Sequence, residues 1–165
     1  MMSDRVDGGE EGQLAASSAT LEPTPNYGVL EECIGYNLRI AYAFASQLFA
    51  QDFDGQDLAP IQFAALEFIA HNPDLSQRQI AAHIGTTPTV LVKPLERLES
   101  MGLVTRTRSV EDRRRSRVRL TEEGGAFLNQ ARPRILQVED RLTANLSKDE
   151  REMLLRLVRK LLEVR

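Results

Sequence analysis

The most constraining stretch of this 165-residue sequence is a pair of short helix signals separated by a glycine. Ser76 followed by Gln79 is a capping box, which predicts a short helix that starts there and ends near Gly85. Thr87 is suited to cap a second helix, with Pro88 at its first position. Two helices joined by a tight turn form a helix-turn-helix unit, whose second helix typically enters the major groove of DNA.

The two alternating segments after Gly102 predict a β-hairpin. LVTRTR and SRVRL alternate apolar and polar residues around the connection SVEDRRR. Val118 and Leu120 are expected to face the core, and Arg117 and Arg119 to face water or a ligand. A hairpin directly after a helix-turn-helix makes it a winged version. We therefore expect a mainly α fold with a two-stranded β wing.

Helical signals account for most of the remaining chain. Apolar residues recur at spacings of three and four over residues 29–51, as in an amphipathic helix. Pro60 is placed to open a second helix, which should end near Pro73. Thr121 is suited to cap a long helix, and Ser147 to cap the last one. The sequence thus predicts helices on both sides of the winged unit.

Length and composition favour one domain with an N-terminal appendage. A chain of 165 residues suffices for one ordinary domain, whereas two independent domains would each be marginal. Residues 1–27 hold few large apolar side chains, so we expect them to form a flexible acidic arm. Residues 28–165 are expected to fold, with the winged helix-turn-helix at about residues 58–121.

Charge is unevenly distributed along the chain, although the net charge is only -3. Residues 1–32 hold seven acidic side chains and one arginine, a local net charge of -6. Residues 103–120 hold seven arginines and two acidic side chains, a local net charge of +5. A solvated charged hairpin would explain this on charge alone. A concentrated basic patch is also the electrostatic footprint of phosphate binding.

Several classes of protein are disfavoured by what the sequence lacks. There is no apolar run long enough for a membrane span, and the first ten residues do not resemble a secretory signal. The single Cys33 cannot form an intrachain disulfide, so we expect a cytoplasmic protein. His71 and His83 are not spaced with Cys33 as metal ligands, and no phosphate loop or nucleophile elbow is present. We expect no catalytic residue, no metal site and no cofactor.

The segment LERLESMGLVTRTRSVEDRRRSRVRLTEEG, from Leu95 to Gly124, resembles the multiple antibiotic resistance regulators, the MarR family. Its spacing of Asp112, Arg114, Leu120, Thr121 and Gly124 is the most specific part, and the resemblance extends over about residues 30–162. It implies a repressor that binds palindromic DNA as a homodimer. In that reading, helices at about residues 29–51 and 122–164 form the dimerisation region.

The resemblance and the outward face of the second helix together give a set of DNA-binding candidates. They are Ser76, Gln77, Thr86, Thr87, Thr89, Val90, Lys93, Arg97, Arg113, Arg114 and Arg115. In similar proteins a wing-tip arginine enters the minor groove, a role that the resemblance gives to Arg114, with Asp112 supporting the tip. Pro94 departs from the family pattern inside the helix and is expected to favour a kink. Lys93 is expected to position phosphates rather than read bases.

The family resemblance also implies a small-molecule effector. The segments GYNLRIA and HNPDLSQ resemble a branch that senses aromatic carboxylates or their coenzyme A thioesters, as in aromatic compound catabolism. Arg39 would suit an anionic group, and aromatic residues would suit a ring. The effector-binding candidates are Tyr36, Arg39, Tyr42, Phe63 and His71. Core packing or surface exposure explains each of these residues equally well.

Two alternatives remain open at this stage. Peroxide sensors of the family carry a reactive cysteine near the start of the first helix, and Cys33 lies about two residues before that position. A half-buried structural cysteine is the competing interpretation. A winged-helix protein-interaction module is the other alternative, and salt-dependent binding to duplex DNA would separate it from a DNA-binding regulator.

Overall fold

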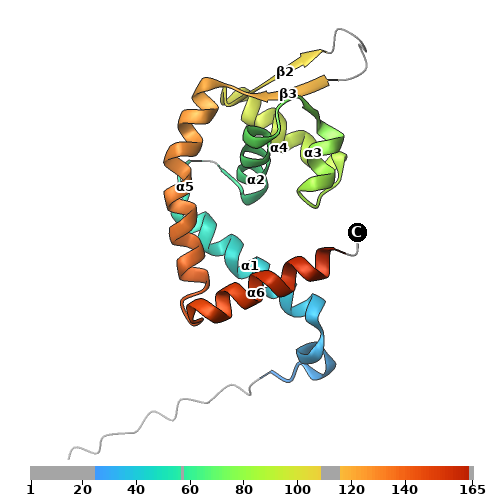
Figure 1. Ribbon diagram of the computed structural model, residues 1–165, viewed down its shortest axis with the longest axis vertical. Coiled ribbons are helices and arrows are strands. Elements are labelled where there is room, and N and C mark those ends of the chain that lie inside the picture. Colours follow the sequence, from blue (N-terminus) through green and yellow to red (C-terminus); the bar gives the residue numbers. More distant parts are fainter. Residues whose placement is uncertain (1–24, 57, 109–115, 164–165) are drawn as a thin grey trace, which may run out of the picture.

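The computed structural model describes residues 25–56, 58–108 and 116–163, and it is mainly helical with one small sheet (Figure 1). Its elements follow one another in this order: η1 Gly28–Glu32, α1 Ile34–Asp52, α2 Pro60–His71, β1 Leu75–Ser76, α3 Gln77–His83, α4 Pro88–Ser100, β2 Val104–Arg108, β3 Ser116–Leu120, α5 Glu122–Leu142 and α6 Lys148–Leu162. The predicted order of helices around a hairpin is confirmed.

Local capping signals place the starts of four helices. The side chains of Ser76, Thr87, Thr121 and Ser147 each accept a hydrogen bond from the backbone N–H three residues further on. Each bond satisfies one of the amide groups that a helix leaves unpaired at its first turn. Helices α3, α4, α5 and α6 therefore begin where the sequence predicted.

The sheet has three antiparallel strands in the order β1-β3-β2. Strands β2 and β3 form the predicted hairpin, in which Val104 lies opposite Leu120 and Arg106 opposite Val118. Strand β1 pairs Leu75 with Val118 as well. This third strand was not predicted, because two residues show no alternation and their partner lies more than 40 positions away in the sequence.

The helix predicted over residues 29–51 is interrupted near its start. The chain first forms η1, Cys33 then has an extended backbone with φ -81° and ψ 105°, and α1 begins at Ile34. The Asn37 side chain donates to the backbone oxygens of Cys33 and Glu31, at 2.9 and 3.1 Å. Apolar spacing continues across the break, so periodicity alone could not show it.

The core lies within the winged unit and extends to the ends of the helices beside it. Leu66 of α2, Ile80 of α3, Leu91 of α4 and Val118 of β3 are buried there. From α5, Leu128, Ala131 and Val138 join the same core. Helix α5 is further tied to α1, because Arg141 donates to Asp52 Oδ1 at 2.6 Å and to Gln51 Oε1 at 2.7 Å.

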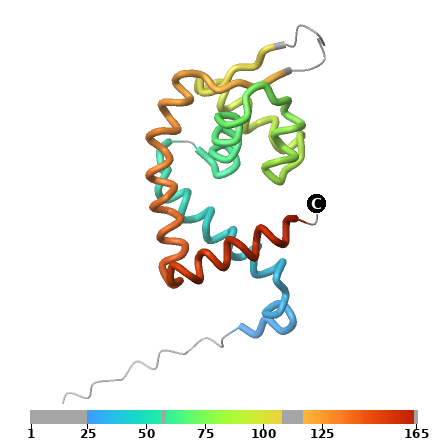
Figure 2. Tube along the Cα trace, viewed as in Figure 1, coloured from blue at the N-terminus to red at the C-terminus, as the bar shows by residue number. Residues whose placement is uncertain are grey.

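Helix α6 and the first half of α1 lie outside that core. Figure 2 shows both at the end of the molecule opposite the sheet, with α5 running between the two ends. Helix α6 buries none of its residues. The exposed large apolar residues of these two helices are Ile34, Leu38, Ile40, Tyr42, Phe44, Met153, Leu154, Leu155, Leu157, Leu161 and Leu162. Among the described residues, no helix is both long and apolar enough to cross a bilayer.

Candidate nucleic-acid interface

Helix α4 has one buried face and one exposed face. Leu91, Leu95 and Leu98 are fully buried on the core side, as predicted. The opposite side exposes four of the candidates for DNA binding, which are Thr89, Val90, Lys93 and Arg97. These four candidates thus lie on the exposed face of α4.

Side chains at the starts of α3 and α4 cap each helix, and one of them joins the two helices. The Gln77 side-chain amide donates to the Pro88 carbonyl oxygen at 2.7 Å. The Ser76 hydroxyl donates to Gln79 Oε1 at 2.8 Å, and Thr87 Oγ1 accepts from the Val90 N–H at 3.3 Å. Ser76, Gln77 and Thr87 were predicted to contact DNA, and their described bonds also give them a structural role. Thr86, the residue before this cap, is half-buried.

Pro94 lies inside α4, and the helix continues through it from Pro88 to Ser100. A proline has no N–H, so the carbonyl of Val90 lacks its usual partner four residues on. The side chain of Pro94 is half-buried. The helix therefore tolerates the proline without ending.

The base of the wing is held by Asp74, in the turn between α2 and α3. Asp74 has φ 65°, a left-handed conformation that aspartate adopts more readily than most residues. Its carboxylate pairs with the Arg119 guanidinium, and its carbonyl oxygen accepts from Arg117 Nη1 at 2.7 Å. The hydrogen bond from Arg119 holds the pKa of the Asp74 carboxyl below its usual value. Arg119 is exposed, as predicted, and Arg117 is half-buried; the Asp74 turn that binds both arginines was not predicted.

Further contacts fix β2 and the start of α5 to α4. Arg106 Nε of β2 lies 3.3 Å from Glu99 Oε2 in the last turn of α4. The Thr121 hydroxyl donates to the Gly102 carbonyl oxygen at 2.7 Å. A Cβ atom at Gly124 would overlap the carbonyl oxygen of Leu103, so only glycine permits this approach. Helix α4, strand β2 and the start of α5 therefore meet at a fixed junction.

The predicted wing-tip residues Asp112, Arg113, Arg114 and Arg115 lie outside the described residues. Their assignment to DNA remains a prediction from the sequence. The described strands β2 and β3 lead directly into this connection.

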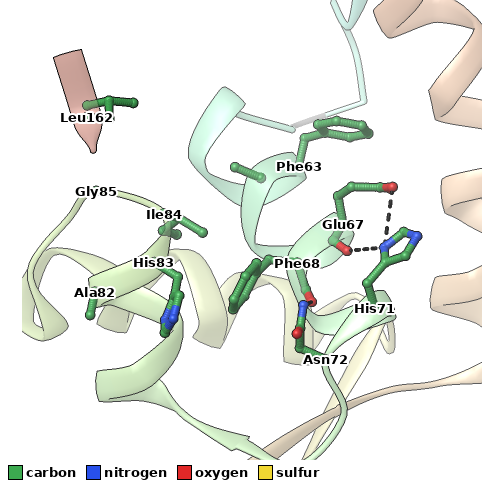
Figure 3. Close-up of a pocket in the computed structure, with 11 residues that line it drawn as sticks. Phe63, Glu67, Phe68, His71, Asn72, Ala82, His83, Ile84, Gly85 and Leu162 are labelled. Carbon is green, nitrogen blue, oxygen red and sulfur yellow. Dashed lines mark hydrogen bonds and ion pairs between the residues drawn. The ribbon is translucent and has the colours of Figure 1, made fainter. Parts of the chain in front are cut away.

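An open cavity of about 960 Å³ lies between α2, α3 and the end of α6 (Figure 3). Phe63 and Phe68 from α2 and Ile84 after α3 supply most of its large apolar side chains. Leu162 of α6 lies across from them, as Figure 3 shows. The volume of the cavity falls within the range of roughly 300–1,000 Å³ that is typical of small-molecule sites.

Polar groups on the cavity wall connect it to α5. Glu67 Oε2 accepts a hydrogen bond from Arg132 Nε of α5 at 3.1 Å, and Glu67 Oε1 lies 3.6 Å from His71 Nδ1. His71 Nδ1 also lies 2.9 Å from the Glu67 carbonyl oxygen. The rings of Phe68 and His83 stack with centroids 5.2 Å apart. The cavity thus combines aromatic surfaces with two imidazoles and one paired carboxylate.

The structure divides the predicted effector residues into two groups. Phe63 and His71 line the cavity. Tyr36, Arg39 and Tyr42 lie on α1 and do not line it, and the Arg39 guanidinium lies 5.4 Å from the centre of the Tyr36 ring.

Sequence reasoning did not select Glu67, Phe68 or His83 as cavity residues. No local signal could have paired Phe68 with His83, because they belong to different helices. The spacing of Glu67 and His71 by one helical turn was visible in the sequence.

Cys33 is half-buried and caps the start of α1 through its backbone. This agrees with the structural interpretation of the cysteine. Among the described residues, no group of three or more His, Cys, Asp or Glu side chains is arranged to hold a metal ion.

Comparisons with known proteins identify the family. A sequence model of the MarR family matches residues 56–115. The HTH-type transcriptional repressor NicR of Pseudomonas putida is 32% identical over 147 residues, which are 89% of this chain and 92% of the relative.

Solved structures of two regulators have the same fold. The transcriptional repressor CouR, solved bound to a 23-mer DNA duplex, is 34% identical with a TM-score of 0.75, over 84% of this chain and 98% of its own. Bordetella bronchiseptica BpsR, whose DNA binding is regulated by 6-hydroxynicotinic acid, is 25% identical with a TM-score of 0.74, over 84% of this chain and 97% of its own. The predicted family and winged fold are confirmed, as is the expectation of a regulator rather than an enzyme. This chain belongs to the MarR family of DNA-binding transcriptional regulators.

Proposed function

We propose that the chain is a repressor, that it binds a palindromic operator as a homodimer, and that an aromatic acid or its coenzyme A thioester releases it. The observation that carries the DNA-binding part is the exposed face of α4, with Thr89, Val90, Lys93 and Arg97 opposite a fully buried leucine face. A helix of this kind, held beside a basic hairpin, suits the major groove. Acting on chromosomal DNA would place the protein in the cytoplasm.

The surface left uncovered on α1 and α6 supports the homodimer. A continuous set of large apolar side chains on a monomer is unfavourable in water, and such patches mark interfaces. Leu157 and Leu161 are about half exposed, and no residue of α6 is buried within its own chain. A second copy would cover the same helices symmetrically. Two-fold symmetry of the protein would then match two half-sites one helical turn of DNA apart.

The cavity between α2 and α3 supports a small aromatic effector. Phe63, Phe68 and His83 offer flat surfaces for a ring, and His71 offers a polar contact. BpsR, a regulator with the same fold, responds to a heteroaromatic acid. A ligand bound in the cavity would also contact Glu67, which accepts a hydrogen bond from Arg132 of α5. A ligand there is placed to change how α5 holds the winged unit, and it shifts DNA binding by its differential affinity for the two arrangements.

The test measures DNA release directly. Operator duplexes selected from a random pool are bound to the wild-type protein, and benzoic, hydroxycinnamic and hydroxynicotinic acids and their thioesters are titrated in. We expect one of these ligands to lower the affinity for DNA between about 5- and 150-fold, the range typical of coupled sites. Calorimetry with Phe63→Ala and His71→Ala should show weaker binding of that ligand.

Two variants separate the remaining interpretations. Arg39→Ala should leave binding of the ligand unchanged if the cavity alone holds it, and should weaken binding if the predicted Arg39 contact forms in the dimer. Peroxide-dependent release that is lost in Cys33→Ser, with no binding of any acid or thioester, would contradict the effector proposal and favour redox sensing. If the protein binds no DNA at any salt concentration or sequence tested, the proposed function as a whole is contradicted.

A further inference from the structure

Val90 is an apolar side chain on the exposed face of α4, where it is 56% exposed. We infer that Val90 contacts the C5-methyl group of a thymine and thereby favours a T·A pair at one position of each operator half-site. The inference rests on the proposed function, because it takes α4 to lie in the major groove. It adds a base preference that the proposed function does not specify.

The position of Val90 favours a base contact over a phosphate contact. Val90 lies in the first turn of α4, three residues after the cap Thr87. The N-terminal residues of a recognition helix are those that reach base edges. The Val90 N–H donates to Thr87 Oγ1 at 3.3 Å, which fixes this turn of the backbone. The side chain, which is 56% exposed, presents its methyl groups to solvent. A phosphate gains nothing from methyl groups.

The chemistry of the surrounding surface makes Val90 distinctive. The exposed neighbours Thr89, Lys93, Glu96 and Arg97 on α4 are polar or charged. Valine has a lower helix propensity than alanine, and Val90 leaves more than half of its surface exposed within its own chain. Neither local folding nor the core therefore explains the residue.

Major-groove chemistry supplies a matching apolar group. Of the four bases, thymine alone presents a methyl group there, whereas cytosine and adenine present amino donors and guanine presents acceptors. Two valine methyls against a thymine methyl exclude water from apolar surface on both sides. A C·G pair at that position would instead place a polar edge against Val90. The side chain thus discriminates between pairs without a hydrogen bond.

The test removes only the methyl group from the DNA. Operator duplexes selected with the wild-type protein are resynthesised with uracil in place of each thymine, one symmetric pair of positions at a time. We expect one pair of substitutions to lower the affinity by roughly fourfold per half-site, the effect of burying about one methyl group. At other thymines of the operator the substitution should have little effect.

Protein variants assign that effect to Val90. Val90→Ala should bind the thymine and uracil operators equally, because the contact is then absent from both. Glu96→Ala is the matched control, an exposed residue of the same helix that is not assigned to DNA, and it should keep the thymine preference. Circular dichroism should show both variants folded, since neither residue is buried.

Two results would overturn the inference while leaving the proposed function standing. One is a wild-type protein that binds its operator and is insensitive to every uracil substitution. The other is a Val90→Ala variant that keeps the same uracil sensitivity. A wild-type protein without sequence-specific binding to duplex DNA would instead contradict the proposed function, and this inference with it.

Discussion

The Asp74 carboxylate pairs with the Arg119 guanidinium, which joins the turn before the helix-turn-helix to the central strand of the wing. One of the two hydrogen bonds runs from Arg119 Nη2 to Asp74 Oδ2 at 2.8 Å. The two residues are 45 positions apart in the sequence. Because β3 leads from the wing connection back to α5, we expect this pair to help orient the wing.

Removing the Asp74 carboxylate should clearly weaken DNA binding while changing the stability of the fold only slightly. Asp74→Gly keeps the left-handed backbone free of strain and deletes the pair. We expect a small decrease in melting temperature, since exposed ion pairs stabilise little, and a several-fold loss of operator affinity. Asp149→Gly in the first turn of α6 controls for the lost negative charge. Unchanged affinity in Asp74→Gly would show that the pair does not orient the wing.

The stability contributed by the Asp74–Arg119 pair should be lost only in acid. The pKa of Asp74 in the folded protein lies below 3.8, its value without the pair. The contribution is therefore fully present above the unfolded pKa and is lost as the pH falls through the lower folded pKa. The melting temperatures of the wild type and Asp74→Asn should differ by a constant amount between pH 5 and 8 and converge at lower pH. A difference that changes between pH 6 and 8 would contradict this assignment.

Gly124 and Gly125 form a matched pair of substitutions at the start of α5. A Cβ at Gly124 would overlap the Leu103 carbonyl oxygen, whereas at Gly125 the nearest atom would lie 3.9 Å away. Gly124→Ala should lower the free energy of unfolding by about 1–3 kcal/mol, the usual cost of overpacking. Gly125→Ala should raise it by up to about 1 kcal/mol, because alanine favours the helix. Urea denaturation distinguishes the two, and equal effects would contradict the close approach.

Charged substitutions on α6 test the homodimer. Leu157→Glu and Leu161→Glu place carboxylates on the exposed apolar face of a helix that has no buried residue within its own chain. We expect the double variant to be monomeric or unfolded, because burying unpaired charges in an interface is unfavourable. Sedimentation velocity with circular dichroism measures both outcomes. The control is Lys148→Glu at the exposed start of α6, which should stay dimeric. A folded dimer of the double variant would refute this interface.

The parts of the fold that the sequence predicted are those fixed by local interactions. The Ser76–Gln79 capping box and the Thr87 cap act within one helical turn, so their residue types show the helix starts directly. The predicted exposure of Thr89 and Lys93 follows from the leucine spacing on the same helix.

The parts that escaped prediction depend on distant partners. Strand β1 forms only because β3 lies beside it. The Arg117 and Arg119 side chains find their partner in the turn at Asp74. The cavity arises where α2 and α3 approach the end of α6, an arrangement that no spacing within one helix reveals. For the turn that binds the two arginines, the sequence did offer one signal, because Asp74 follows Pro73 and aspartate is favoured in turns.

The most direct test of the account is the salt dependence of binding to the selected operator, measured by fluorescence anisotropy for the wild type and Arg114→Ala. Arg114 lies outside the described residues, and the family resemblance assigns it to the minor groove. We expect log affinity to fall linearly with log salt, by about 0.9 for each phosphate contacted. Arg114→Ala should remain a folded dimer, bind much more weakly and show a shallower slope. Affinity that is independent of salt, or equal in the two proteins at physiological salt, would contradict the claim that the recognition helix and wing bind DNA.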